Sequence, residues 1–263
     1  MILTSFSGIV LWTKIVLLIN VRHEDSDILQ YTLINVKLIG LTWFQLSVRL
    51  VSDIIKIMKP YEGMTKDNTA LLVIDPINSC AHERCETPEW NIHYTKIREM
   101  LPKLADFVVE YKKNFGGLVA YVKLTSWTKE NLPKNIKTLY EDPKANYYSN
   151  DPSGFEELFH TVKPSEDDLV FIKNTYDAFS NEDLVKELNQ RKIRYVVMTG
   201  IFTDGCVLAT IVSGFSKGFN FVILKDLIET TDDPERQELQ KLLIGFTFPV
   251  MYGKTITSAE FLV

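Results

Sequence analysis

Short apolar runs alternate with longer stretches of helical periodicity from Thr69 to the end of the chain. A run of about five consecutive apolar residues is typical of a strand that is buried on both faces of a parallel sheet. Apolar residues spaced three and four apart are typical of a helix with one face against a core. The sequence therefore predicts strands at 70–74, 118–122, 169–172, 194–200, 220–224 and 248–252.

Helical patterns fill the intervals between these strands. They cover 92–114 and 204–217, and two further helices open at Ser180 and at Asp233, where residues suited to helix N-termini stand. This alternation predicts an α/β fold: a doubly wound, mostly parallel six-stranded sheet with helices on both faces, a Rossmann-like three-layer sandwich. The polar stretch 125–166 is expected to be a long loop with one helical turn near 154–160.

The first 57 residues differ in composition from the rest of the chain. Apolar residues number 32 of these 57, all ten prolines lie at Pro60 or later, and the first alanine is Ala70. We therefore predict an apolar N-terminal extension at 1–57 and a separate domain at 58–263. The extension has three interpretations: a misassigned start upstream of Met58, which we favour, an interfacial helical anchor, or an extra packed element.

Charge and cysteine content narrow the class of protein. The net charge of −5 offers no basic excess for a phosphate backbone, so we expect no nucleic-acid partner. The apolar run that starts at Gly8 is interrupted by Lys14 and is too short to span a bilayer, so a membrane partner is not expected. Three cysteines are too few for a disulfide framework, which favours a reducing, cytoplasmic compartment.

Chemically active residues stand where the predicted strands end. Asp75, Lys123 and Lys173 finish the first three strands, and Cys206 follows the fourth within a glycine-containing segment at a helix start. The carboxyl ends of parallel strands form one edge of a sheet, which is where ligands bind. A helix N-terminus favours a thiolate over a thiol and can hold an oxyanion. Each residue alone also fits a structural role: a buried small side chain, a turn acid or a solvated lysine.

The motifs around these residues resemble the isochorismatase-like cysteine hydrolase superfamily. The resemblance extends from Thr69 to about Leu262 and includes Lys225-Asp226 and Thr230-Thr231-Asp232. Its main segments are Ile74-Asp75, Ile172-Lys173-Asn174-Thr175-Tyr176-Asp177-Ala178-Phe179 and Thr199-Gly200-Ile201-Phe202-Thr203-Asp204-Gly205-Cys206-Val207-Leu208-Ala209-Thr210.

The resemblance implies a catalytic triad of Asp75, Lys173 and Cys206. It also implies an oxyanion hole formed by the backbone N–H groups of Phe202 and Cys206, beside a cis peptide bond between Ile201 and Phe202. Members of the superfamily act on small molecules, so the partner is a small-molecule substrate, and a homo-oligomer, dimer or tetramer, is expected.

Two departures from the superfamily pattern limit the choice of activity. Many members carry Gln two residues and an aromatic residue five residues after the first aspartate, where this chain has Ile77 and Cys80. Nicotinamidases carry an Asp-x-His metal motif after the second strand, where this chain has 123–127 without Asp or His. We therefore expect no metal and no other cofactor, and do not expect a nicotinamidase.

Aromatic and apolar side chains near these motifs are candidates for substrate contacts, although the aromatic ones fit the core equally well. The candidate substrate-binding residues are Ile77, Trp127, Tyr176, Phe179 and Phe202.

Cys206 favours hydrolysis of a C–N bond, because superfamily members that cleave the vinyl ether of isochorismate can lack this cysteine. The expected function is therefore a cysteine-dependent hydrolase of a small amide or other C–N bond, with a thioester intermediate and no metal. Two alternatives remain: a vinyl-ether hydrolase of the isochorismatase type, and a non-catalytic interaction protein on the same fold.

Overall fold

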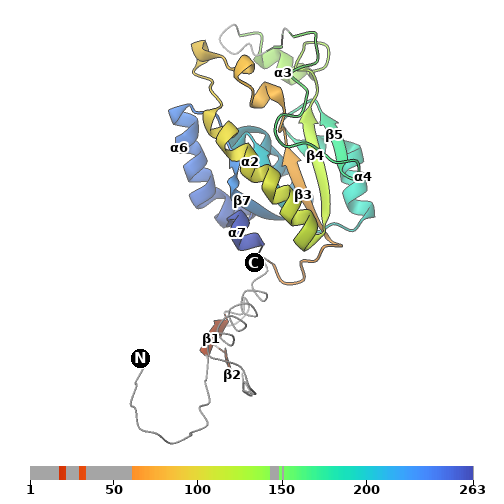
Figure 1. The fold of residues 1–263 in the computed structure, drawn as a ribbon, viewed down its shortest axis with the longest axis vertical. Coiled ribbons are helices and arrows are strands. Elements are labelled where there is room, and N and C mark those ends of the chain that lie inside the picture. Colours follow the sequence, from red (N-terminus) through yellow and green to blue (C-terminus); the bar gives the residue numbers. More distant parts are fainter. Residues whose placement is uncertain (1–17, 22–29, 34–60, 143–147, 150, 263) are drawn as a thin grey trace, which may run out of the picture. The chain divides into compact units, whose positions relative to one another are not determined.

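The structure is a computed structural model that describes residues 61–142, 148–149 and 151–262, together with the backbone of two short upstream strands (Figure 1). These strands, β1 (Leu18–Val21) and β2 (Gln30–Leu33), pair antiparallel with each other. The chain divides into two units, 1–54 and 55–263. Apart from these two strands, the extension 1–57 and the predicted boundary at Met58 lie outside the described residues.

The larger unit is built on a six-stranded sheet in which every neighbouring pair of strands is parallel. From β3 the chain moves outward through β4 to β5, then crosses to β6 on the other side of β3 and continues through β7 to β8. The direction reverses between β3 and β6, and such a switch point is where α/β sheets bind ligands. The strands are β3 (Thr69–Ile74), β4 (Leu118–Leu124), β5 (Leu169–Lys173), β6 (Tyr195–Ile201), β7 (Asn220–Glu229) and β8 (Gly253–Ile256).

Successive residues of the central strands pack on opposite faces of the sheet. Leu71 and Val73 of β3 belong to one buried apolar cluster, whereas Leu72 and Ile74 belong to another. The neighbouring strands contribute to both clusters, and helices pack against the sheet on each side, which confirms the predicted three layers (Figure 1). No helix in the described part of the chain has the length and apolar character needed to cross a membrane. The first face is covered by α2 (Thr95–Glu110) and α7 (Ser258–Phe261), the second by α4 (Glu182–Gln190) and α5 (Leu208–Ser216).

The last strand begins at Gly253, so the prediction of a strand from Phe248 is wrong. Residues 243–252 instead continue α6 (Pro234–Leu242) as a π-helical segment that buries Phe248. An uncharged apolar run resembles a buried strand whether it is extended or helical, which explains the error. The pairing of the last strand with its neighbour starts at Gly253. Only glycine fits there, because a Cβ would lie 2.2 Å from the carbonyl oxygen of Phe221.

The long connection between β4 and β5 contains its helix at a different place from the predicted one. The helix is α3 (Lys134–Leu139), which begins after Pro133 and buries Ile136. The predicted helical turn at 154–160 is wrong: this segment forms turns and an isolated bridge between Phe159 and Ile77. The connection therefore folds back onto the residues that follow β3.

Candidate active site

Asp75 follows β3 directly, and its side chain is completely buried. Its φ angle is 50°, in the left-handed region that aspartate tolerates better than most residues. Its N–H donates to the carbonyl of Val122 in β4 (2.9 Å), and its own carbonyl accepts from the N–H of Ile77 (2.8 Å). Hydrogen bonds of its N–H and its carbonyl therefore fix the backbone of Asp75 at the end of β3, and with it the position of the carboxylate.

Beside Asp75, β6 approaches β3 so closely that its sixth residue must be glycine. Gly200 pairs with Ile74, has a φ of +113°, and would place a Cβ 2.2 Å from the carbonyl oxygen of Ile74. The peptide bond between Ile201 and Phe202 is cis, as the resemblance implies. A π-helical turn, Thr203–Val207, then leads into α5.

This turn holds Cys206. The carbonyl of Phe202 accepts hydrogen bonds from the N–H groups of Gly205 (3.0 Å) and Val207 (3.1 Å), which closes the turn. The Cys206 side chain is 4% exposed and belongs to the apolar cluster on the α4 and α5 face. The nucleophile candidate is thus a buried thiol at the entrance of a helix.

Lys173, the last residue of the edge strand β5, joins the acid and the thiol. Its Nζ lies 2.8 Å from Oδ2 of Asp75, 3.2 Å from Sγ of Cys206 and 3.1 Å from the carbonyl oxygen of Thr175. These three acceptors match the three N–H bonds of an ammonium group. The fold therefore brings together Asp75, Lys173 and Cys206, which follow or end three different strands.

Burial and the charges of this cluster together raise the pKa of the thiol. Burial raises the pKa of Cys206 to about 12, and the Asp75 carboxylate adds to the increase while the Lys173 ammonium opposes it. Burial alone would lower the pKa of Lys173, but Asp75 and Cys206 outweigh it, so the pKa is raised and the lysine stays charged. Burial and the Asp75 carboxylate therefore act against the thiolate that the helix start was expected to favour.

The other lysine at a strand end has a different role. Nζ of Lys123 donates to the carbonyl of Glu157 (2.8 Å) and lies 5.1 Å from the ring centroid of Phe159. Lys123 thus anchors the connection between β4 and β5. It contributes nothing to the Asp75 cluster.

Two of the candidate substrate-binding residues lie in one aromatic cluster. The rings of Trp127 and Tyr176 are 5.9 Å apart. Tyr140 links them, because its hydroxyl accepts from Nε1 of Trp127 (3.2 Å) and lies 3.2 Å from the Tyr176 hydroxyl. Tyr140 is not among the predicted residues, because nothing local in the sequence distinguishes it from the other tyrosines of this stretch.

Two other candidates lie in the core. Phe179 is 3% exposed and stacks on Phe219 at 5.1 Å, and Gly214 leaves the space for its ring. Ile77 is 1% exposed and packs in the cluster on the α2 face. Both side chains are therefore used in packing, and their assignment as substrate contacts stays a prediction.

The remaining two cysteines are free, like Cys206. Cys80 is buried, and burial raises its thiol pKa strongly, with the charges of Asp75 and Cys206 adding to the increase. Cys85 is partly exposed, with a pKa raised by burial to about 11. Among the residues that the structure describes, no group of three or more His, Cys, Asp or Glu side chains is arranged to hold a metal ion.

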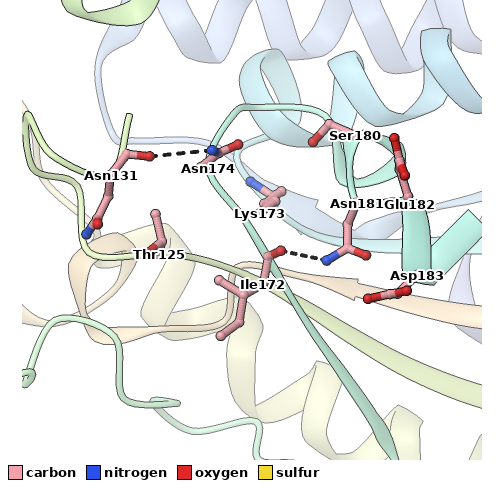
Figure 2. Close-up of a pocket in the computed structure, with 9 residues that line it drawn as sticks. All are labelled: Thr125, Asn131, Ile172, Lys173, Asn174, Ser180, Asn181, Glu182 and Asp183. Atoms are coloured by element: carbon pink, nitrogen blue, oxygen red, sulfur yellow. Dashed lines mark hydrogen bonds between the residues drawn. The ribbon is translucent and has the colours of Figure 1, made fainter. Parts of the chain in front are cut away.

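A polar groove of about 440 Å³ lies at the carboxyl end of β5 (Figure 2). Lys173 belongs to its lining, whereas Asp75 and Cys206 do not. Hydrogen bonds from Asn174 to the Asn131 carbonyl (3.4 Å) and from Asn181 to the Ile172 carbonyl (2.7 Å) tie its walls together. The groove therefore borders the strand end that supplies the lysine.

The sequence profile described as Isochorismatase domain matches residues 69–254. The chain belongs to the isochorismatase family. This hydrolase is 24% identical over 164 residues to the uncharacterized isochorismatase family protein YwoC of Bacillus subtilis, covering 62% of this chain and 82% of YwoC. It is 32% identical over 130 residues to the ureidoacrylate amidohydrolase RutB of Variovorax paradoxus, covering 47% of this chain and 50% of that enzyme.

Solved structures share the fold of this family member. A cysteine hydrolase from Pseudomonas syringae superimposes with a TM-score of 0.64 at 18% identity, covering 78% of this chain and 95% of that one. An N-carbamoylsarcosine amidase from Thermoplasma acidophilum gives 0.54 at 20% identity, covering 74% and 97%. The chain spans about half the length of the ureidoacrylate amidohydrolases that it matches.

Proposed function

We propose that the protein hydrolyses a small amide or related C–N bond through a thioester on Cys206. The observation that carries the proposal is the position of Nζ of Lys173, 2.8 Å from Oδ2 of Asp75 and 3.2 Å from Sγ of Cys206. A buried thiol with a raised pKa needs a base to become a nucleophile, and the carboxylate beside it is that base. The lysine keeps the site neutral when the proton moves from sulfur to carboxylate.

In the first half of the reaction, Asp75 accepts the proton of the Cys206 thiol and the sulfur attacks the carbonyl carbon. The resulting oxyanion accepts hydrogen bonds from the N–H groups of Phe202 and Cys206, which stand in the turn that Gly205 and Val207 close. Asp75 then gives its proton to the nitrogen, the C–N bond breaks, and the amine leaves an acyl thioester.

In the second half, water hydrolyses the thioester. Asp75, again a carboxylate, takes a proton from water, and the hydroxide attacks the thioester carbon. The second oxyanion collapses, the C–S bond breaks, and the sulfur of Cys206 recovers the proton from Asp75. The acid product leaves, and the site returns to one carboxylate, one ammonium and one thiol.

The similar proteins support a C–N bond as the target. The names ureidoacrylate amidohydrolase and N-carbamoylsarcosine amidase both describe enzymes of compounds that carry an N-carbamoyl group. The aromatic cluster of Trp127, Tyr140 and Tyr176 supports a flat substrate group, because aromatic faces stack well on planar amides. Trp127, Tyr176 and Phe202 remain our candidates for contacts to it.

We also propose that the protein is a homo-oligomer and works in a reducing compartment such as the cytoplasm. The segment 242–253 contains no charged residue, and Phe246, Val250 and Met251 in it are more than half exposed. An exposed apolar surface of this kind is typical of an interface. Three free thiols fit reducing conditions.

Mass spectrometry of the intact protein and of its peptides tests the mechanism. The enzyme is mixed with small primary amides, N-carbamoyl acids and isochorismate, then quenched in acid within milliseconds to seconds. We expect turnover of at least one C–N substrate and an acyl mass on the peptide that contains Cys206. Cys206→Ala abolishes the adduct, and Asp75→Asn lowers its rate of formation by about 10³-fold or more, because residues that act as one unit lose most of the rate singly. Turnover of isochorismate without an adduct would refute the amidase proposal.

A further inference from the structure

The helix α6 contacts the turn that holds Cys206. Arg236 of α6 donates from Nε to Oδ2 of Asp204 (2.7 Å) and from Nη2 to Oδ1 of Asp204 (2.8 Å). The hydroxyl of Thr230 also donates to Oδ1 of Asp204 (2.5 Å). Asp204 is two residues before Cys206, and its side chain is only 7% exposed. The fork of the guanidinium therefore fixes a buried carboxylate inside the turn.

The same guanidinium covers the residue that opens the turn. Its central carbon lies 4.9 Å from the ring centroid of Phe202. The Phe202 ring also stacks on the ring of Tyr94, with centroids 5.9 Å apart and planes inclined by 24°. Tyr94 is itself fixed, because its hydroxyl donates to the carbonyl of Ser79 (3.1 Å). Arg236 thus restrains the turn at Phe202 and at Asp204.

We propose that Arg236 is a positioning residue for the oxyanion-binding turn. By fixing Asp204 and packing on Phe202, it holds the backbone N–H groups of Phe202 and Cys206, and Sγ of Cys206, at the places that the reaction needs. This inference rests on the proposed function, because it concerns the same turn. Misplacement of a reacting group by about 1 Å can lower a rate by about 10²-fold, so a residue away from the bond that breaks can control kcat.

The first test measures kcat and KM of the variants Arg236→Met and Arg236→Lys. Met keeps the aliphatic bulk but loses both hydrogen bonds, and Lys keeps the charge but cannot form the fork. On an amide that the wild-type protein hydrolyses, we expect kcat to fall about 100-fold in the Met variant and about 10-fold in the Lys variant. KM should change less than about threefold, because the guanidinium is occupied by Asp204.

A matched control removes an arginine–carboxylate pair elsewhere. Arg191, just after the end of α4, pairs with Glu187 at 2.6 Å, so Arg191→Met deletes an arginine–carboxylate interaction away from the turn. It should leave kcat within a factor of two. If Arg236→Met does not fold, Arg236→Lys and Asp204→Asn take its place in the same measurements, because both weaken the contact between Arg236 and Asp204.

Hydrogen exchange of the full-length protein is the second test and needs no substrate. In Arg236→Met, the amides of Gly205 and Val207, which close the turn, should exchange at least 10-fold faster, with the exchange of α2 unchanged. Arg191→Met should exchange like the wild type. Unchanged exchange in the turn, unchanged kcat, or an increase in KM with kcat unchanged would each overturn the positioning role. If the wild-type protein hydrolyses no amide, the proposed function fails, and the exchange measurement still decides whether Arg236 orders the turn.

Discussion

At the scale of single residues, the site depends on the competition between burial and charge. Cys206 is surrounded by the core, so its thiolate would lose hydration, and the nearby Asp75 carboxylate disfavours a second negative charge. The Lys173 ammonium compensates only one of these two anions. In the proposed mechanism, Cys206 is therefore held as a thiol, and the Asp75 carboxylate is the base that would activate it.

Alkylation by N-ethylmaleimide tests this protonation state. At pH 8 and without substrate, we expect Cys85 to react first, because it is partly exposed and its pKa of about 11 is below the value of about 12 for Cys206. Only the thiolate reacts, so a raised pKa lowers the reactive fraction at pH 8, and the rate should rise about 10-fold per pH unit up to the pKa. Peptide mapping at several pH values measures both rates, with Cys206→Ser as control. Fastest modification of Cys206 at pH 8 would mean that Lys173 outweighs burial.

At the scale of elements, the close contact of β3 and β6 builds the site. Gly200 has no Cβ, so the carbonyl of Ile74 can approach its α-carbon, and the two strands end side by side. This contact sets Asp75 beside the turn of Cys206, because each follows its strand by at most five residues. A lysine from β5, two strands away from β3, then closes the cluster.

Substituting Gly200 with alanine tests the importance of this approach. The new methyl would lie 2.2 Å from the Ile74 carbonyl oxygen, so the strands must separate, and we expect a loss of stability of about 3 kcal/mol or more. Gly218→Ala is the matched control: its φ is also positive, at +92°, but a Cβ there meets no atom within 4 Å. It should cost about 1 kcal/mol. Urea unfolding curves compare the two, and equal losses would show that the contact is unimportant.

At the scale of the whole molecule, the sheet has an apolar cluster on each face. The members of these two clusters, with the partly buried residues packed against them, run from Tyr61 to Leu262. A domain of about 200 residues buries enough surface to be stable without further segments. Asp75, Lys173 and Cys206 all lie after the compositional change near Met58.

A chain that begins at Met58 should therefore fold and remain active. We expect its thermal midpoint to lie within about 2 °C of the full-length value and its kcat on the same amide to be unchanged, because a change of about 1 kcal/mol shifts the midpoint of such a domain by about 2–4 °C. Melting curves and sedimentation of both chains measure this. Aggregation of the shorter chain, or a midpoint several degrees lower, would show that 1–57 has a structural role.

The sequence by itself determined the α/β layers and three of the residues at the site. Apolar runs and helical spacing are local properties, so they predict strands and helices without knowledge of the partners. Asp75, Lys173 and Cys206 could be identified because each stands at or after a strand end within a family motif. Only the tertiary structure decided that the three side chains meet, that burial raises the pKa of the thiol, that Phe179 packs in the core, and that Arg236 binds Asp204 in the turn. Those outcomes depend on contacts between residues far apart in the chain, and burial by distant segments sets both the pKa of a thiol and the surroundings of a side chain.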